Sequence, residues 1–196
     1  MKILLISAGT KENGATERAV REASDVLVKN GVNYDIFRLY TSAIQTCNGC
    51  GVCIVKNRCI HEDNATRLAD IAADFDGYIF FTPVHYAGAS GAMKSALARL
   101  FYSKKKSLEY KPAAAVAVSR RAGNVCATEE ITRFFSFASM PCVSGNYPGV
   151  IYGTTDKEIE KDTEGLKTIR SIAENMIWLL RCIEAGKSIG IYPKST

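Results

Sequence analysis

The sequence predicts an α/β domain built on a doubly wound, five-stranded parallel sheet with helices on both faces. Short apolar runs alternate repeatedly with helical patterns along the chain, an order that produces parallel strands joined by right-handed crossovers. The strand-like runs are continuously apolar, as in strands buried on both faces. A chain of 196 residues is long enough for one domain with a substantial core. We therefore expect a single domain over residues 1–196.

Local patterns place the individual elements. Branched, aromatic or small residues bounded by turn residues predict strands at 3–6, 34–40, 77–82, 113–119 and near 142–144. Apolar residues at helical spacing predict helices at 19–27, 68–72, 89–102, 128–138 and 155–185. Asn30-Gly31 is a helix stop, Pro83 is expected to end the third strand, and Thr155 with Glu158 is a capping box that opens the last helix.

Composition and charge narrow the class of protein. Hydrophobic residues make up 47% of the chain and charged residues 23%, which is ordinary for a globular protein. No apolar run is long enough for a bilayer span, and the one at the amino terminus is too short for a signal peptide, so we expect a cytoplasmic protein without a membrane role. Eight of the Lys and Arg residues lie between residues 94 and 121, a local charge that suits an anionic ligand or one charged face. No base-stacking motif accompanies it, so nucleic-acid binding is not expected.

In sheets of this kind, ligands bind outside the carboxyl ends of the strands. The first such segment is residues 7–16, which is rich in hydroxyls and lies before a helix. Ala15 occupies the place where a P-loop needs lysine, and the dinucleotide fingerprint is missing. Two interpretations remain, a loop for a monophosphate at a helix N-terminus and an ordinary capped turn.

A cluster of four cysteines follows the second predicted strand, in a loop at about residues 41–63. Its spacing is Cys47-x2-Cys50-x2-Cys53-x5-Cys59, close to a bacterial iron–sulfur run but with a longer last gap and no following proline. A four-cysteine zinc site and four free thiols are the alternatives. The other cysteines, Cys126, Cys142 and Cys182, are expected to be small core residues.

Two further segments follow strands three and four. After the third strand, His85 and Tyr86 are expected at the top edge of the sheet, with small residues that allow a flat ring to approach the backbone. His85 could contact a cofactor or simply lie on a surface loop. After the fourth strand, Arg120 and Arg121 suit anionic groups, or form a solvated pair. Lys104-Lys105-Lys106 is expected to be a solvated loop.

These segments together resemble the flavodoxin-like NAD(P)H-dependent FMN reductases, especially their iron–sulfur flavoprotein branch. Asn13-Gly14-Ala15-Thr16 is similar to the family's Asn-Gly-Asn-Thr, and Pro83-Val84-His85-Tyr86 is similar to its Pro-Val-Tyr-Tyr. The resemblance implies strand order 2-1-3-4-5 and FMN at the three loops. The implied FMN-binding residues are Ser7, Thr10, Asn13, Gly14, Ala15, Thr16, Pro83, Val84, His85, Tyr86, Ala87, Gly88, Ser119, Arg120, Arg121 and Gly123. The implied ligands of a possible [4Fe-4S] cluster are Cys47, Cys50, Cys53 and Cys59.

The resemblance also implies a function. We expect an FMN oxidoreductase that takes electrons from NAD(P)H and passes them to a quinone, another small acceptor or the cluster. No side chain is needed as a general acid or base, so no catalytic residue is assigned. The alternatives are an electron carrier that works with a ferredoxin-like partner, and a redox or metal sensor that uses the cysteines. A homodimer or homotetramer is expected.

Overall fold

The computed structural model describes residues 1–194. Five parallel strands form the sheet: β1 (Lys2–Ser7), β2 (Asn33–Arg38), β3 (Gly77–His85), β5 (Ala113–Ser119) and β6 (Val150–Tyr152). Their order is β2-β1-β3-β5-β6, so the parallel strands follow the predicted order 2-1-3-4-5. The short β4 (Gly88–Ala89) pairs antiparallel with the end of β3 and makes the sheet six-stranded. The predicted fold class is confirmed, with this one added strand.

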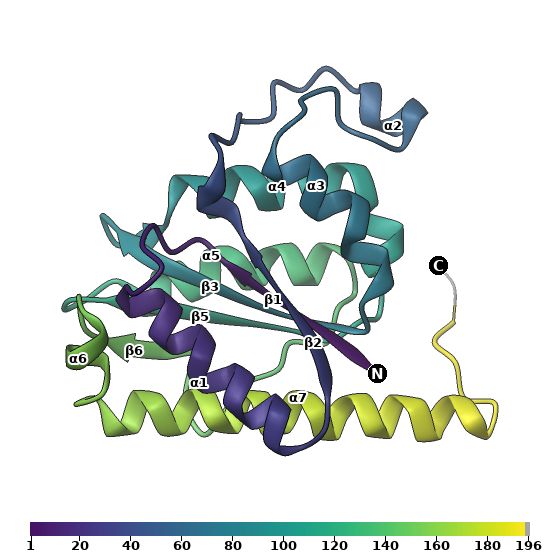
Figure 1. The fold of residues 1–196 in the computed structure, drawn as a ribbon. Coiled ribbons are helices and arrows are strands. Elements are labelled where there is room, and N and C mark those ends of the chain that lie inside the picture. Colours follow the sequence, from purple (N-terminus) through teal and green to yellow (C-terminus); the bar gives the residue numbers. More distant parts are fainter. Residues whose placement is uncertain (195–196) are drawn as a thin grey trace.

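Helices cover both faces of the sheet (Figure 1). One face is covered by α1 (Ala15–Lys29) and α7 (Thr163–Ser188). The other face is covered by α3 (Asn64–Ile71), α4 (Gly91–Leu108) and α5 (Asn124–Phe137). The short helices are η1 (Leu39–Thr41), α2 (Val52–Lys56), η2 (Ala72–Asp74) and α6 (Asp156–Ile159). Figure 1 shows α2 and its flanking segments beyond the α3–α4 layer, on the side away from α7.

The two faces of β1 divide the core into two layers. Ile3 and Leu5 pack with α1 and α7, while Leu4 and Ile6 pack with α3, α4 and α5. Successive side chains of a strand point to opposite faces, so burial on both sides requires an unbroken apolar run. This is the physical reason that the sequence of β1 shows no polar alternation.

The prediction that Pro83 ends the third strand is wrong. β3 continues through Pro83 to His85, and Pro83 pairs with Val118 of β5. The carbonyl of Phe81 accepts from Ala8 on the β1 side, so an N–H at position 83 would point the same way, beyond the last residue of β1. A proline costs no ladder hydrogen bond at such a position.

The fifth strand lies later than predicted. Near residues 142–144 there is only an isolated bridge between Cys142 and Ala113, and the paired strand is Val150–Tyr152. The chain leaves the sheet in between and returns at Gly149, whose carbonyl accepts from Ala117 over 2.7 Å. A Cβ at Gly149 would lie 2.0 Å from the carbonyl oxygen of Ala115, so glycine allows this return.

The predicted last helix is two helices. Thr155 caps the short α6 by accepting from the Glu158 N–H over 3.2 Å, whereas the Glu158 carboxylate bonds the Thr154 N–H rather than that of Thr155. Asp162 caps α7 by accepting from the Gly165 N–H over 2.9 Å. α7 continues past residue 185, where the last helix is predicted to end, and stops at Ser188.

Two further expectations concern single segments. Lys104-Lys105-Lys106 is not a loop but part of α4, which is kinked at Lys104. Within residues 1–194, no helix has the length and apolar character that crossing a membrane requires.

Candidate functional site

The three predicted loops meet at the carboxyl end of the sheet. They line one open pocket of about 290 Å³, and Gly153 and Thr154, which follow β6, also line it. The predicted residues that line it are Thr10, Gly14, Ala15, Thr16, Pro83, Val84, His85, Ser119 and Arg120. Gly9, Lys11 and Val118 line it as well. The topology therefore brings segments about seventy and a hundred residues apart in sequence into one site, as the carboxyl-end rule predicts.

The loop after β1 leads directly into the N-terminus of α1. Gly14 is the N-cap of α1 and makes no side-chain cap hydrogen bond, and the first N–H groups of a helix have no partner within the helix. Thr16 lies in this first turn, and a Cβ at Gly9 would lie 2.9 Å from the Thr16 Cβ. The loop thus folds closely over a helix end that suits an anion such as a phosphate.

Ser7 lies beneath this loop rather than on the pocket wall. Its hydroxyl donates to the carboxylate of Glu17 and accepts from the Gly9 N–H over 3.1 Å. Glu17 is buried and also accepts from Arg38 Nε over 3.0 Å. Sequence reasoning missed Glu17 and Arg38, because their pairing depends on β2 lying beside β1. Ser7 thus fixes the shape of the loop from below.

The segment after β3 is a β-hairpin. Its two turn residues, Tyr86 and Ala87, have φ of 49° and 63°, both in the left-handed region that primed hairpin turns require. Tyr86 is fully exposed. Ala89 N–H donates to Glu130 Oε2 of α5 over 2.7 Å, and a Cβ at Gly88 would lie 2.9 Å from the same oxygen. α5 therefore holds the hairpin beside the pocket.

The segment after β5 is tied to the sheet by Asn124. Its side chain accepts from the Ser119 hydroxyl over 2.6 Å and donates to the carbonyls of Ala117 and Ile151 over 3.2 and 3.1 Å. These bonds join the ends of β5 and β6 directly under the pocket. Arg120 is exposed at the pocket rim, where its charge can attract an anionic group. No local pattern singled out Asn124, because its partners lie on two different strands.

The cysteine segment forms a second site. Cys47, Cys50, Cys53 and Cys59 all line one cavity of about 150 Å³, together with His61, Arg99 and Tyr102. Gly49 and Gly51 have φ of 71° and 72°, a left-handed conformation that turns the chain around the cavity.

The donor set of this cavity, four cysteine thiols, is of the kind that holds an iron–sulfur cluster. Among residues 1–194, no three His, Cys, Asp or Glu side chains lie close enough together to hold one metal ion as they stand. A four-iron cluster is held by four thiolates, one to each iron, so its ligands surround a larger volume. Four cysteines around one cavity meet that requirement.

Arg99, an arginine of the basic stretch at residues 94–121, lies beside the cysteines and is buried. Arg99 of α4 is 2% exposed. It forms an ion pair with Asp63 and donates from Nε to Cys59 Sγ over 3.3 Å. Burial opposes the charge on Arg99, but the hydrogen bond to Asp63 and the contact with Cys59 hold its pKa above the usual value. Sequence reasoning missed this residue.

The prediction that the remaining cysteines belong to the core is wrong. Cys126, Cys142 and Cys182 are all exposed. Cys126 and Cys182 lie on the outer surfaces of α5 and α7, and Cys142 lies on the interrupted edge before β6. A helical or strand assignment does not by itself decide which face a single small residue occupies.

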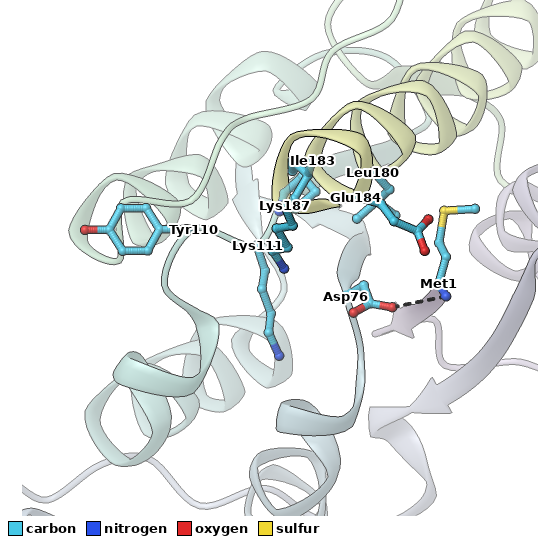
Figure 2. Close-up of a pocket in the computed structure, with 9 residues that line it drawn as sticks. Met1, Asp76, Tyr110, Lys111, Leu180, Ile183, Glu184 and Lys187 are labelled. Atoms are coloured by element: carbon cyan, nitrogen blue, oxygen red, sulfur yellow. Dashed lines mark ion pairs between the residues drawn. The ribbon is translucent and has the colours of Figure 1, made fainter. Parts of the chain in front are cut away.

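A third cavity, of about 240 Å³, lies at the opposite end of the sheet (Figure 2). Its lining includes Met1, Asp76 and Pro112, which directly precede β1, β3 and β5. Figure 2 shows the terminal amine of Met1 paired with Asp76, and Glu184 and Lys187 of α7 reaching toward the same space. The amino ends of parallel strands are not where such sheets bind ligands, so we assign the site to the carboxyl end.

The strand order, with a polar pocket at the carboxyl ends of the strands, defines a flavodoxin-like fold. The chain belongs to the NADPH-dependent FMN reductase family, whose model matches residues 1–155.

Known relatives and solved structures agree with this assignment. The chain is 27% identical over 192 residues to an iron–sulfur flavoprotein of Methanocaldococcus jannaschii, covering 94% of this chain and 100% of the relative. It is 25% identical over 192 residues to one of Archaeoglobus fulgidus, covering 90% and 96%. A flavodoxin of Streptococcus pneumoniae superposes with a TM-score of 0.61 at 14% identity, covering 91% of this chain and 99% of the flavodoxin. The relatives are thus iron–sulfur flavoproteins of about the length of this chain, and the family match supports a flavin oxidoreductase or electron carrier.

Proposed function

We propose that the chain, as one domain, binds FMN in the three-loop pocket and moves electrons between NAD(P)H, FMN and a [4Fe-4S] cluster on the four cysteines. The observation that carries this proposal is the convergence of the three loops on one pocket at the carboxyl ends of the strands. When bound, FMN accepts a hydride from a nicotinamide and releases electrons to an acceptor. The protein's own part is to bind, orient and tune the cofactor.

The three loops divide the binding of FMN between them. The uncapped N-terminus of α1 and the Thr16 hydroxyl hold the phosphate. The β3–β4 hairpin and the segment after β5 hold the flavin ring, with backbone groups of Val84 and His85 on one side and Arg120 at the other. A cation near the ring stabilises added negative charge, so Arg120 favours the reduced flavin.

The surface around the cysteines favours a second candidate function, an electron carrier that serves a protein partner. Ile54 and Val55 of α2 are 78% and 87% exposed beside the cysteine cavity. An exposed apolar rim next to a redox centre suits docking of a ferredoxin-like protein. In this version, NAD(P)H reduces the flavin slowly or not at all.

One experiment tests the proposal and separates its versions. The protein is purified without oxygen, and its visible spectrum, FMN, iron, sulfide and zinc are measured. Rapid mixing then compares reduction by NADH, by NADPH and by a reduced ferredoxin. We expect about one FMN and four iron atoms per chain, since four thiolates hold one such cluster. Colourless protein that does not take up FMN contradicts the proposal, and zinc in place of iron favours the sensor.

Matched cysteine variants test the ligand assignment. Cys50→Ser changes an exposed cysteine of the cavity, and Cys126→Ser changes an exposed cysteine on α5. We expect C50S to lose iron and sulfide while it keeps FMN, and C126S to keep all three. Equal iron in both variants would contradict the assignment. Light scattering during size exclusion tests the homodimer or homotetramer that the family resemblance predicts.

A further inference from the structure

All the N–H groups of the Arg99 guanidinium donate hydrogen bonds to the segment that carries the cysteines or to the start of α3. Nε donates to Cys59 Sγ over 3.3 Å. Nη1 donates to the Gln45 carbonyl over 3.2 Å and to the Asp63 carboxylate, and Nη2 donates to the His61 carbonyl over 3.0 Å and to Thr66 Oγ1 over 2.6 Å. A guanidinium has five N–H groups, so every donor of this buried side chain has a partner.

These bonds close the base of the cysteine loop. Gln45 precedes the first cysteine, and Cys59, His61 and Asp63 include and follow the last one. Asp63 also accepts from the Gln45 N–H over 2.9 Å and caps α3. One side chain on α4 therefore ties together the two ends of a loop whose middle, including Cys47 and Cys50, is exposed.

The same helix begins directly after the β3–β4 hairpin, whose β3 end lines the pocket. Ser90 caps α4, and its N–H donates to Thr82 Oγ1 of β3 over 3.0 Å. From Gly91 to Arg99 the helix rises on the order of 12 Å. Arg99 thus fixes the position of Cys59 relative to the hairpin that borders the pocket.

We propose that Arg99 is a positioning residue of the cysteine site, which sets the place of Cys59 and, through its charged hydrogen bond to Cys59 Sγ, raises the reduction potential of the centre that the cysteines bind. Hydrogen bonds to the sulfurs of a cluster tune its potential, and positive charge stabilises the reduced form. This inference rests on the proposed function, because it requires a redox-active centre at the cysteines.

Lysine cannot replace arginine in this role. A lysine ammonium has three donors on a flexible stem, whereas five acceptors surround the guanidinium at fixed positions. The matched control is Arg67→Lys on α3, since Arg67 is exposed and lies beside the same loop.

The test uses anaerobically purified protein with FMN and cluster bound. Iron and sulfide are measured per FMN, and the cluster potential is measured by a redox titration monitored by electron paramagnetic resonance, with the FMN potential as internal reference. We expect Arg99→Lys to bind iron about 10- to 100-fold more weakly and to lower the potential of the cluster that remains. FMN content and potential stay as in the wild type, and R67K changes nothing.

Three outcomes overturn the inference. If R99K keeps the wild-type iron content and cluster potential, Arg99 neither positions nor tunes the site. If R99K loses iron but the residual cluster keeps its potential, the hydrogen bond to sulfur has no redox effect. If the wild type itself contains no iron, the proposed function fails first, and this inference fails with it.

A second measurement does not depend on the cluster. Trypsin cleaves after Lys56, which lies in the exposed part of the loop. In metal-free protein, we expect faster cleavage at Lys56 in R99K than in the wild type or R67K. Equal rates in all three proteins would show that Arg99 does not close the base of the loop.

Discussion

Gly123 lies so close to Ala87 that a Cβ on Gly123 would be 2.5 Å from the Ala87 Cα. Gly123 also has φ of 93°, in a region that favours glycine. The segment after β5 thus packs directly on the hairpin turn after β3. These two segments border the same pocket, so the shape of the pocket depends on this contact.

Gly123→Ala is therefore expected to weaken FMN binding as well as stability. The added methyl group pushes the hairpin away and strains the backbone, at a cost of about 1–3 kcal/mol. Fluorescence titration with FMN and urea unfolding measure the two effects. Gly31→Ala is the control, because Gly31 has a similar φ of 65° but nothing within 4 Å of its Cβ. Equal FMN affinity in G123A and wild type would contradict the role of this contact.

Thr16→Val tests the phosphate end of the pocket. A hydrogen bond from a threonine hydroxyl to a charged phosphate contributes about 1.5–3 kcal/mol to the binding free energy. Its loss should therefore lower FMN affinity about 10- to 100-fold. Affinity for riboflavin, which lacks the phosphate, should stay the same. Thr132→Val on α5 is the control, since its hydroxyl donates to the Glu129 carbonyl away from the pocket. An equal loss of affinity for FMN and riboflavin would show that Thr16 does not bind the phosphate.

Ser7→Ala tests the support beneath the loop. The substitution leaves the buried Glu17 carboxylate without its hydroxyl donor, which should destabilise the fold by about 1–3 kcal/mol. Urea unfolding of the metal-free protein measures this. Ser188→Ala removes an exposed hydroxyl that bonds the Ala185 carbonyl and should have little effect. If S7A is as stable as S188A, the Ser7–Glu17 bond contributes nothing to the loop.

Asp63→Asn breaks the buried ion pair at the cysteine loop. Asparagine keeps the cap of α3 but leaves the Arg99 charge without its counterion, which should cost about 3–5 kcal/mol. Asp70→Asn breaks a surface pair with Arg58 and should cost less than about 1 kcal/mol. Denaturant unfolding at neutral pH compares the two. Similar losses in D63N and D70N would contradict the importance of the buried pair.

The same aspartate predicts a dependence of stability on pH. Burial alone raises the pKa of Asp63, but hydrogen bonds from Arg99 and the Gln45 N–H outweigh it and hold the pKa below its usual range. A carboxyl group whose pKa is lower in the folded than in the unfolded protein stabilises the fold. This contribution is complete above the pKa of the unfolded state, which is about 3.9 for aspartate. That stability is lost as pH falls through the folded pKa. Wild-type protein should therefore lose more stability than D63N between pH 5 and pH 2, roughly the range of aspartate titration, and parallel curves would contradict this.

The sequence predicted the fold and the place of the main site because both follow from local patterns. Continuous apolar runs such as Ile3 to Ile6 identify buried parallel strands, and alternation with helices sets their topology. The carboxyl-end rule then brings the segments after Ile6, Thr82 and Val118 to one pocket. Cysteine spacing likewise marked the second site without any knowledge of the fold.

Only the tertiary structure decided how these sites are supported. Ser7 meets Glu17, Cys59 meets Arg99, and Ala89 meets Glu130 across 10, 40 and 41 residues of sequence. The position of the last strand and the continuation of β3 through Pro83 also depended on pairing with β5, which is distant in sequence from both. A local pattern records the preference of one segment, whereas a buried polar group is satisfied by whatever partner the folded chain brings within hydrogen-bonding distance.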